Sequence, residues 1–344
     1  MKEGWVKCKL SDICTKGSSN ISLNKIEDNN GNYALYGASG FVKGIDFYHQ
    51  SSQYLGVVKD GSGVGRVNIY PPKSSLVGTM QYIFPNNNCL LGFLKYLLEG
   101  LHLDKFKTGA AIPHIYFKDY GKCDIFIPPL SEQQHIVEEL DLLSSIIDKK
   151  KAQLKELDSL AQSIFYEMFG DPVTNEKGWI NKKLKEVYKL KSGDGLSAKQ
   201  FVEGSYPVYG GNGISGYHNA YNMDGNYIII GRVGVYCGNV RLVKGKFWLT
   251  DNAFQLYYDS DKQIAIFVKY LLTLLDLHRC ANKAAQPVIS NQTLRDVGVL
   301  FPPLPLQQQF ASKVEAIEHQ KDIIKQSIVE VETLFNSRMD YYFN

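Results

Sequence analysis

The segment FLKYLL at Phe93–Leu98 recurs 174 positions later as FVKYLL at Phe267–Leu272. The stretch PPL, with two glutamines shortly after it, recurs at the same offset, from Pro128–Gln134 to Pro302–Gln308. A constant offset over so much of the chain indicates two copies of one whole domain, because arrays of small repeats have periods of about 20–50 residues. Two related domains on one chain present two similar surfaces.

The length and composition are those of a globular protein with more than one domain. At 344 residues the chain fits two domains with connecting segments. No apolar run approaches the ~20 residues of a membrane span, and the N-terminus has no signal-peptide core, so we expect a cytoplasmic protein without a membrane partner. The six cysteines have no C-x-x-C spacing, which favours reduced, buried thiols and argues against a metal site.

Each copy begins with a globular part that is rich in Gly, Tyr, Val and Ile. Short alternating runs, such as 54–58 and 227–230, predict strands that are separated by Gly/Asn turns. One amphipathic helix is predicted near Gly92 and another near Ile264. We therefore expect an α+β fold with two pseudo-symmetric domains of mainly β core, at residues 1–129 and 171–303.

Each copy ends in a segment with heptad spacing, and these segments predict long helices at 130–170 and 304–344. At ~1.5 Å per residue, a helix of about 38 residues is close to 57 Å long. Cations fill three slots of the heptads, at Lys150, Lys321 and Arg338. The apolar positions of the first segment are Ile136, Leu140, Leu143, Ile147, Leu154, Leu157, Ala161, Ile164 and Met168. Those of the second are Phe310, Val314, Ile317, Ile324, Ile328, Val331, Phe335 and Tyr342.

The two helical segments can pair in two ways. The ends of a compact domain often lie close together, so the second helix is expected to run back along the first as an antiparallel coiled coil within one molecule. The two domains then lie at opposite ends of the coiled coil. Pairing with the helix of another molecule is the alternative, since parallel homodimers use the same pattern.

The net charge alternates along the chain. It is +4 for residues 1–129, −4 for 130–170, +5 for 171–303 and −2 for 304–344. A polyanion is attracted to basic domains and not to an acidic spacer. The same values also arise in proteins that bind no nucleic acid, because coiled-coil flanks are commonly rich in Glu.

Two matched loops are candidates for ligand binding. The first is an aromatic loop bracketed by glycines, at 36–44 and 209–218, and glycine allows a backbone to approach a ligand closely. The second is a Gly-rich turn, at 59–67 and 232–241, whose cations could hold phosphates or read guanine. Tight turns with solvated cations explain the same residues without a ligand. The candidate DNA contacts are Tyr36, Ser39, Lys43, Lys59, Arg66, Tyr209, Asn212, Tyr217, His218, Arg232 and Arg241.

A third matched element, at 108–114 and 282–288, consists mostly of small residues before a proline and could serve packing or ligand contact. His114 has Val288 as its counterpart, which excludes a catalytic histidine shared by both copies. The chain has no G-x-x-x-x-G-K-[ST] loop, no hydrolase or metalloprotease motif, and no methyltransferase tetrapeptide around its Pro-Pro pairs. The sequence therefore shows no catalytic apparatus.

Over essentially its whole length, the chain resembles the specificity subunit of a type I restriction-modification system. The resemblance rests on duplicated domains, each closed by the stretch [IF]-P-P-L-x-x-Q-Q at Ile127–Gln134 and Phe301–Gln308. The Tyr-Gly-x-x-Gly loop, the stretch Thr250–Phe254 and the Ala-Ala-x-Pro element add to it. One departure is visible, because Glu132 of the first copy is replaced by Leu306 in the second.

The resemblance implies a non-catalytic subunit of a DNA methylation complex that binds double-stranded DNA. Each target-recognition domain then reads one half of a bipartite, asymmetric site, and the helices set the gap. It also implies two methyltransferase (modification) subunits and motor-nuclease (restriction) subunits as partners. No cofactor is expected on this chain, since S-adenosylmethionine, ATP and Mg belong to the partners. The candidate docking residues are Pro129, Gln133, Gln134, Pro303, Gln307 and Gln308.

Two other functions remain open. A self-contained enzyme, such as a fused methyltransferase or nuclease, is disfavoured by the missing motifs. The main alternative is a non-catalytic structural adaptor that binds proteins or glycans through two β-rich ends, which the aromatic content and modest net charge support. The salt dependence of binding distinguishes a DNA-binding subunit from such an adaptor, because DNA binding weakens steeply as the salt concentration rises.

Overall fold

The computed structural model describes residues 4–109, 112–282 and 284–344. The chain divides into two compact units: unit 1 comprises Met1–Lys151 and Gln326–Asn344, and unit 2 comprises Ala152–Lys325. Two long helices, α4 (Leu130–Phe169) and α8 (Leu304–Phe343), each contribute one part to each unit. None of the described helices is both long and apolar enough to span a membrane.

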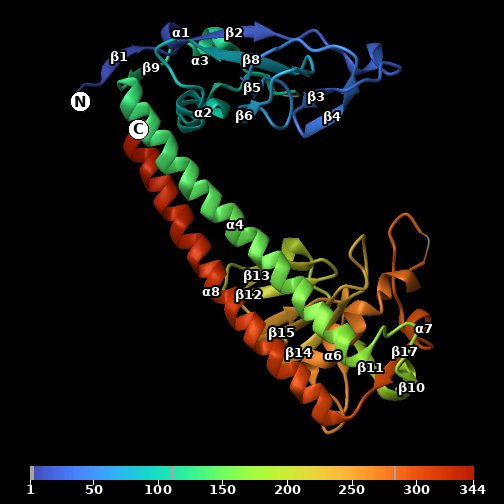
Figure 1. The fold of residues 1–344 in the computed structure, drawn as a ribbon. Coiled ribbons are helices and arrows are strands. Elements are labelled where there is room, and N and C mark those ends of the chain that lie inside the picture. Colours follow the sequence, from blue (N-terminus) through green and yellow to red (C-terminus); the bar gives the residue numbers. More distant parts are fainter. Residues whose placement is uncertain (1–3, 110–111, 283) are drawn as a thin grey trace. The chain divides into compact units, whose positions relative to one another are not determined.

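Unit 1 has a mainly β core (Figure 1). An antiparallel sheet has the order β2 (Cys14–Ser18), β8 (Met80–Pro85), β5 (Tyr54–Val58), β6 (Val67–Tyr70). A second sheet pairs β3 (Tyr33–Gly37) antiparallel with β4 (Gly40–Ile45) and parallel with β7 (Ser74–Leu76). The helix α2 (Leu91–Gly100) packs on β5, β6 and β8. The other elements include the ribbon β1 (Val6–Lys9)–β9 (Asp124–Ile127), the short helices α1 (Leu10–Ile13) and α3 (Phe117–Tyr120), and the 3-10 helices η1 (Leu23–Lys25) and η2 (Leu103–Phe106).

Unit 2 repeats this order of elements along the chain, but its main strands form one larger sheet. Its strands run β11 (Lys189–Ser192), β16 (Ala253–Tyr257), β14 (Met223–Gly231), β15 (Val240–Leu249), β12 (Tyr206–Gly210), β13 (Gly213–His218). The helix α6 (Ala265–Leu274) packs on β15. The other elements include the ribbon β10 (Ile180–Lys183)–β17 (Gly298–Phe301), the short helices α5 (Leu184–Val187) and α7 (Asn291–Leu294), and the 3-10 helices η3 (Ala198–Gln200) and η4 (Leu277–Cys280).

The units differ where one long strand of unit 2 corresponds to two short strands of unit 1. The strand β15 pairs antiparallel with β14 and, at Trp248 and Leu249, parallel with β12. The equivalent chain of unit 1 forms β6 and then β7, with Pro71 and Pro72 between them. Because proline has no N–H to donate to a ladder, this pair ends β6 and splits the sheet. In both units the corresponding hairpin nevertheless pairs with the end of this segment: β3–β4 pairs with β7 in unit 1, and β12–β13 pairs with the end of β15 in unit 2.

Within each unit the two long helices run antiparallel and pair with each other. In unit 1, Arg338 Nη2 donates to Oε2 of Glu139 at 2.9 Å, and these hydrogen bonds hold the pKa of Glu139 below its usual value. In unit 2, Lys321 Nζ lies 2.7 Å from Oδ1 of Asp158. Two cations that occupy heptad slots therefore meet acids on the facing helix. The predicted fold class, with mainly β domains and an antiparallel coiled coil within one molecule, is confirmed.

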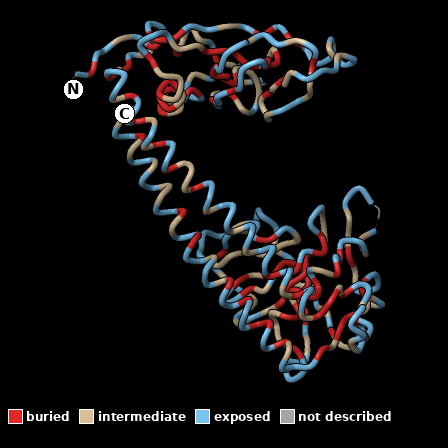
Figure 2. Tube along the Cα trace, viewed as in Figure 1, coloured by how far each residue is buried: buried red, intermediate tan, exposed pale blue. Residues whose placement is uncertain are grey.

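The buried face of α4 departs from the predicted heptads near its C-terminal end. Buried residues gather inside each globular domain (Figure 2). In unit 2 they include Phe165 and Phe169, both fully buried, whereas the predicted seam residues Ile164 and Met168 are only partly buried. The rings of Phe165 and Phe169 lie 5.8 and 4.8 Å from the ring of Phe267 in α6. This end of α4 packs on α6 as well as on α8. Its buried residues, Phe165 and Phe169, therefore each follow by one position the residues that the heptads predicted, Ile164 and Met168.

We expect Phe165→Ala to lower the free energy of unfolding of the full chain by about 3–5 kcal/mol, since it removes a fully buried ring from an aromatic cluster. The exposed neighbour Tyr166 provides the control, because Tyr166→Ala should change stability by less than about 0.5 kcal/mol. Urea unfolding followed by circular dichroism measures both changes. An equal loss in the two variants contradicts the assigned register.

Candidate nucleic-acid interface

A hairpin with the same geometry is present in both units. In unit 1, Tyr36 of β3 pairs with Phe41 of β4, and Gly37 pairs with Gly40 across a two-residue tip. In unit 2, Tyr209 pairs with Ile214, and Gly210 with Gly213. Gly40 and Gly213 have φ of +105° and +103°, a backbone conformation that glycine adopts without strain. The side chains after these glycines, Phe41 and Ile214, are 66% and 52% exposed, so each hairpin presents an apolar residue to solvent.

The other two matched elements converge with each other. In unit 1 the Gly-rich turn donates from Gly61 N–H to the carbonyl of Pro113 at 2.9 Å, and in unit 2 Gly234 N–H donates to Pro287 at the same distance. The third element therefore lies beside the second in each copy. Residues 110, 111 and 283 of this element are outside the described residues.

The contact between these two elements is polar in one copy and apolar in the other. His114 Nδ1 lies 2.7 Å from Oδ1 of Asp60 in unit 1. The equivalent bridge of unit 2 joins Val233 and Val288. Both partners have changed together, so the contact is retained while its chemistry differs. His114 is thus held by a contact with Asp60 that serves the local structure of unit 1.

The predicted contact residues of unit 1 differ in how far they are free to meet a ligand. Ser39 and Arg66 are exposed, and with Tyr36 they line a hollow of about 430 Å³ between the hairpin tip and β6. Lys59 Nζ is half-buried, 3.9 Å from Oδ2 of Asp60. Lys43 Nζ donates to the carbonyls of Ile26 and Glu27, so this cation holds a neighbouring loop. The structure thus brings Tyr36, Ser39 and Arg66 together and assigns Lys43 to internal contacts.

The predicted residues of unit 2 divide in the same way. Asn212, Tyr217 and Arg241 are exposed, and Arg241 Nη2 donates to the carbonyl of Asn212 at 3.3 Å. His218 is buried, and its Nδ1 accepts from the Val202 N–H at 3.0 Å. Arg232 Nη1 donates to Ser192 Oγ and to the carbonyl of Asp251, at 2.8 and 2.9 Å. Tyr209 packs on the ring of Phe247, 5.3 Å away. His218 and Arg232 therefore support the loops from inside.

Further exposed side chains lie at the same loops and escaped the sequence analysis. Asn68 and Ile69 line the hollow of unit 1 with Arg66 and the hairpin tip. Ile214 lines a hollow of about 460 Å³ in unit 2, together with Asn212. Burial raises the pKa of Tyr70, at the wall of the first hollow, so this phenol stays protonated. Aligning the two copies of the sequence would have identified Asn68 as a candidate contact.

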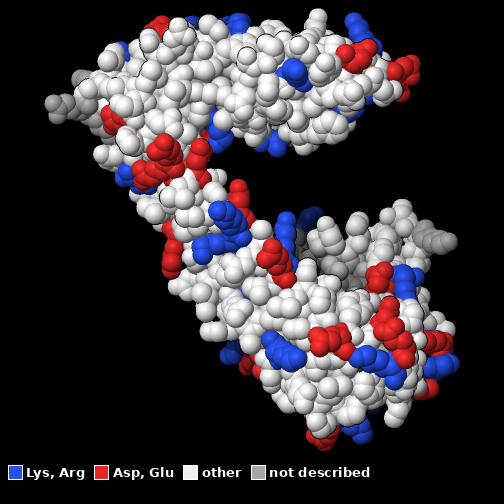
Figure 3. Space-filling model, viewed as in Figure 1, with Lys and Arg blue, Asp and Glu red and all other residues white. Residues whose placement is uncertain are grey.

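The charged side chains do not form one basic patch on the visible face. Figure 3 shows Lys and Arg interspersed with Asp and Glu over both globular domains. The exposed cations of the loops, Arg66 and Arg241, are therefore local features. A ligand at these loops would therefore meet individual charged side chains and not a uniformly basic surface on this face.

A cysteine and a histidine meet in unit 2, which the sequence analysis did not anticipate. Cys237 Sγ lies 3.3 Å from Nδ1 of His278. The same Nδ1 is 3.0 Å from the carbonyl of Cys237, and a nitrogen that donates to a carbonyl cannot also accept the thiol proton. Cys237 is buried, and burial raises its pKa. Val64 stands at the equivalent position of unit 1. The pair is therefore a packing contact and not a nucleophile with its base.

The first glutamine of each P-P-L-x-x-Q-Q stretch is an internal brace. Gln133 is fully buried; its Oε1 accepts from Leu90 N–H at 2.8 Å, and its Nε2 donates to the carbonyls of Asn88 and Pro128, both at 2.9 Å. Gln307 is fully buried too and bonds Ile264, Lys262 and Pro302 in the same way, at 3.0, 3.2 and 2.9 Å. In contrast, Pro129, Gln134, Pro303 and Gln308 are exposed at the start of α4 and α8.

The departure between Glu132 and Leu306 is explained by two equivalent tryptophans. Trp5 Nε1 donates to Oε1 of Glu132 at 3.0 Å. Leu306 cannot accept a hydrogen bond, and Trp179 Nε1 donates instead to the carbonyl of Phe169 at 2.8 Å. Both indoles thus bond to the long helix α4, at its first turn in unit 1 and its last turn in unit 2.

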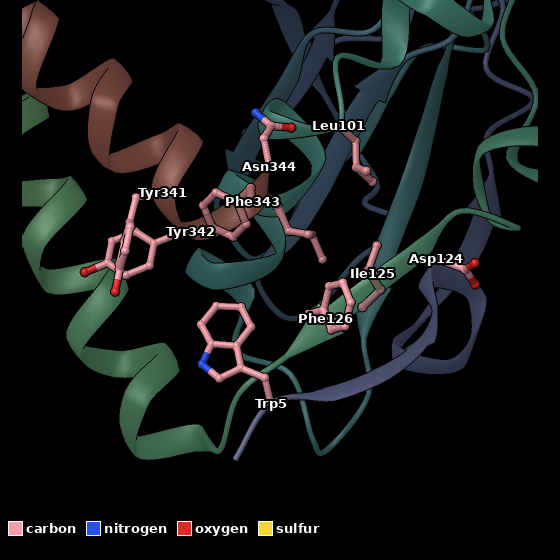
Figure 4. Close-up of a pocket in the computed structure, with 10 residues that line it drawn as sticks. Trp5, Leu101, Asp124, Ile125, Phe126, Tyr341, Tyr342, Phe343 and Asn344 are labelled. Atoms are coloured by element: carbon pink, nitrogen blue, oxygen red, sulfur yellow. The ribbon is translucent and has the colours of Figure 1, made fainter. Parts of the chain in front are cut away.

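A further hollow of about 430 Å³ lies in unit 1 beside the end of α8 (Figure 4). Trp5, just before β1, Phe126 of β9 and Phe343 of α8 point toward it. The carboxylate in its lining, Asp124, is held 3.3 and 2.5 Å from Lys7 and Lys9. Most of its lining residues are aromatic or aliphatic, which suits packing more than acid–base chemistry.

The fold is that of a known class of DNA-specificity proteins. The crystal structure of the type I restriction-modification system S subunit from M. genitalium matches with a TM-score of 0.65 and 16% identity, covering 99% of this chain and 96% of that one. The family model described as the type I restriction modification DNA specificity domain matches twice, at residues 2–158 and 176–333. The chain therefore belongs to the family of type I restriction-modification specificity subunits, which are non-catalytic.

Curated relatives are similar over part of their length. The specificity subunit of the type I restriction enzyme EcoprrI of Escherichia coli is 33% identical over 161 residues, or 45% of this chain and 39% of that protein. A putative type I specificity subunit of Mycoplasma pneumoniae is 24% identical over 169 residues, or 47% of this chain and 46% of the relative. These alignments thus span less than half of either relative.

We expect Gln133→Ala to lower the free energy of unfolding by about 2–4 kcal/mol, because it leaves the Leu90 N–H and two carbonyls without their partner. The adjacent Gln134→Ala should change it by less than about 0.5 kcal/mol, since this side chain is exposed. Chemical denaturation of both variants checks the assignment. Equal stability would show that Gln133 is not a brace.

Proposed function

We propose that this chain is the sequence-reading subunit of a type I restriction-modification complex, in which each globular domain reads one half of a bipartite, asymmetric site in double-stranded DNA. The observation that carries the proposal is the recurrence of one loop geometry with different exposed side chains. The hairpin tips keep their pairing and glycine conformation, while Ser39 and Phe41 are replaced by Asn212 and Ile214. Two loops with the same backbone geometry but different exposed side chains suit two half-sites of different sequence.

The geometry of the loops suits a DNA groove. A two-stranded β-ribbon fits the major groove, where base edges carry a distinct pattern of donors and acceptors. Each hairpin ends in a narrow tip with a positive-φ glycine, and an exposed arginine lies at the hairpin of each unit, Arg66 or Arg241. Arginine pairs with guanine through two hydrogen bonds. The exposed Phe41 and Ile214 supply apolar surface of the kind that marks an interaction site. The proposed contacts are therefore Tyr36, Ser39, Lys59, Arg66, Asn212, Tyr217 and Arg241.

The long helices set the unread gap between the half-sites in this proposal. Each is 40 residues long, or about 60 Å at ~1.5 Å per residue. One turn of duplex measures about 34–36 Å, so a helix of this length corresponds to roughly 1.7 turns. Ion pairs across the helices, at Arg338 and Lys321, fix their register and with it the gap.

The start of each long helix is the proposed docking surface for two modification subunits. Pro129 and Gln134 are exposed there in unit 1, and Pro303 and Gln308 are exposed in unit 2. The same side chains presented twice suit two copies of one partner. Gln133 and Gln307 are left out of this surface because both are buried braces. S-adenosylmethionine, ATP and Mg belong to the modification and restriction subunits, and the complex acts in the cytoplasm.

Selection from a random duplex library tests the proposal. The full chain should enrich a bipartite sequence, and its affinity should fall steeply as salt is raised, since DNA binding releases counterions. Gel shifts at increasing salt measure the slope. Affinity that stays flat with salt, or a library without an enriched motif, refutes the DNA-reading function and favours an adaptor for proteins or glycans.

Arg66→Ala and Arg241→Ala should each weaken binding to the selected duplex by about 5- to 150-fold, which corresponds to the loss of one bidentate base contact of about 1–3 kcal/mol. Arg295→Ala is the matched control, because this arginine lies beside Asp296, 3.7 Å away, at the end of α7. Fluorescence anisotropy with the labelled duplex measures all three. Equal affinities for Arg66→Ala and Arg295→Ala contradict the assigned loops.

Gln134→Ala combined with Gln308→Ala should reduce capture of the modification subunits at least tenfold while leaving DNA affinity unchanged. The reason is that both side chains are exposed at the start of the long helices, away from the proposed reading loops in sequence. Co-purification of the tagged chain with the modification subunits measures the change, and Ser159→Ala on the exposed side of α4 is the control. Unchanged capture removes these residues from the docking surface.

A further inference from the structure

Two side chains exchange places between the copies. When the Gly-rich turns are aligned residue by residue, Gly61 matches Gly234 and Gly65 matches Gly238. Arg66 then matches Asn239, and Asn68 matches Arg241. All four are exposed. Both copies therefore present one arginine and one asparagine, two residues apart, in opposite order.

The strand pairing supports this alignment independently of the sequence. Val67 pairs with Val57, and Val240 pairs with Ile230. The next pair along is Asn68 with Gly56 in unit 1 and Arg241 with Ile229 in unit 2. The exchanged side chains thus occupy equivalent places: one precedes the strand and the other is its second residue. Successive residues of a strand alternate between faces, so the two exposed positions share a face.

In unit 1 both positions border the hairpin that contributes the other proposed contacts, and in unit 2 position 241 does so. Arg66 and Asn68 line the same hollow as Ser39 and Gly40. In unit 2, Arg241 Nη2 donates to the carbonyl of Asn212 at the hairpin tip. Residues two apart on a strand are about 6.6 Å apart, close to two base steps of about 3.4 Å each. A strand that lies along a groove therefore places the two side chains at bases two steps apart.

We propose that positions 66 and 68, and their equivalents 239 and 241, determine base specificity, and that the two domains demand guanine and adenine in exchanged order. Arginine forms two hydrogen bonds with O6 and N7 of guanine, whereas asparagine forms two with N6 and N7 of adenine. The exchange of Arg and Asn between equal positions then exchanges the two bases. This inference rests on the proposed function and adds to it which side chains read which bases.

The test is a double exchange in one domain of the full chain, Arg66→Asn with Asn68→Arg. Selection from a random duplex library should return a motif in which guanine and adenine have exchanged places in one half-site only. The relative affinity for guanine over adenine at each exchanged position should change by about 5- to 150-fold. The reciprocal variant, Asn239→Arg with Arg241→Asn, should exchange the bases of the other half-site only. All four side chains are exposed, and matching thermal melts of the variants and the wild type verify folding.

Three results overturn the inference. The first is an unchanged motif for both double variants. The second is binding that weakens equally for all sequences, which is the behaviour of an arginine that contacts phosphate. The third is Asn68→Ala with an unaltered preference at every position. A wild-type chain that enriches no motif is a different outcome, because it refutes the DNA-reading function itself.

Discussion

The buried glutamine braces are the constraint on which each unit depends. Gln133 and Gln307 are each fully buried and bond the chain before α2 or α6 to the start of a long helix. A buried amide that loses a partner costs about 1–3 kcal/mol for each unsatisfied group, so each globular domain is held to its own helix in one arrangement. In the proposed function a loop can select bases only if it is held in place, and Gln133 and Gln307 tie the chain before α2 and α6 to the start of the long helices.

Much of this frame could be predicted from the sequence, because it depends on periodic patterns. The constant offset of FLKYLL and FVKYLL revealed the duplication, and the heptads revealed both long helices. The pattern shifted at Phe165 and Phe169, because heptad spacing describes contact between two helices and this end of α4 also contacts α6. Likewise, the split of one sheet followed from a single pair, Pro71 and Pro72, whose effect is visible only beside the uninterrupted β15.

The candidate site was less predictable, because the type of a side chain does not determine its partner. His218, Lys43 and Gln133 are polar and lie in promising motifs, yet each is engaged by backbone groups of its own unit. Ser39 and Arg66 lie in the same motifs and are exposed. Hydrogen bonds to carbonyls and N–H groups that are distant in sequence separate these two groups, and no local pattern encodes them. Asn68 was missed for a related reason, since its equivalence to Arg241 emerges only when both copies are compared.

The divergence of the copies follows a physical rule. Where two residues contact each other they changed together, as with Asp60–His114 and Val233–Val288. Where a residue supports the frame it was kept, as with Gln133 and Gln307. Where a side chain faces solvent it changed freely, as with Phe41 and Ile214. A contact that is shielded from water tolerates compensated change better than a change of one partner, because an unmatched polar group there costs free energy. Exposed loop positions carry no such cost, so this architecture can alter what a loop contacts while the sheet, the brace and the helix pair remain the same.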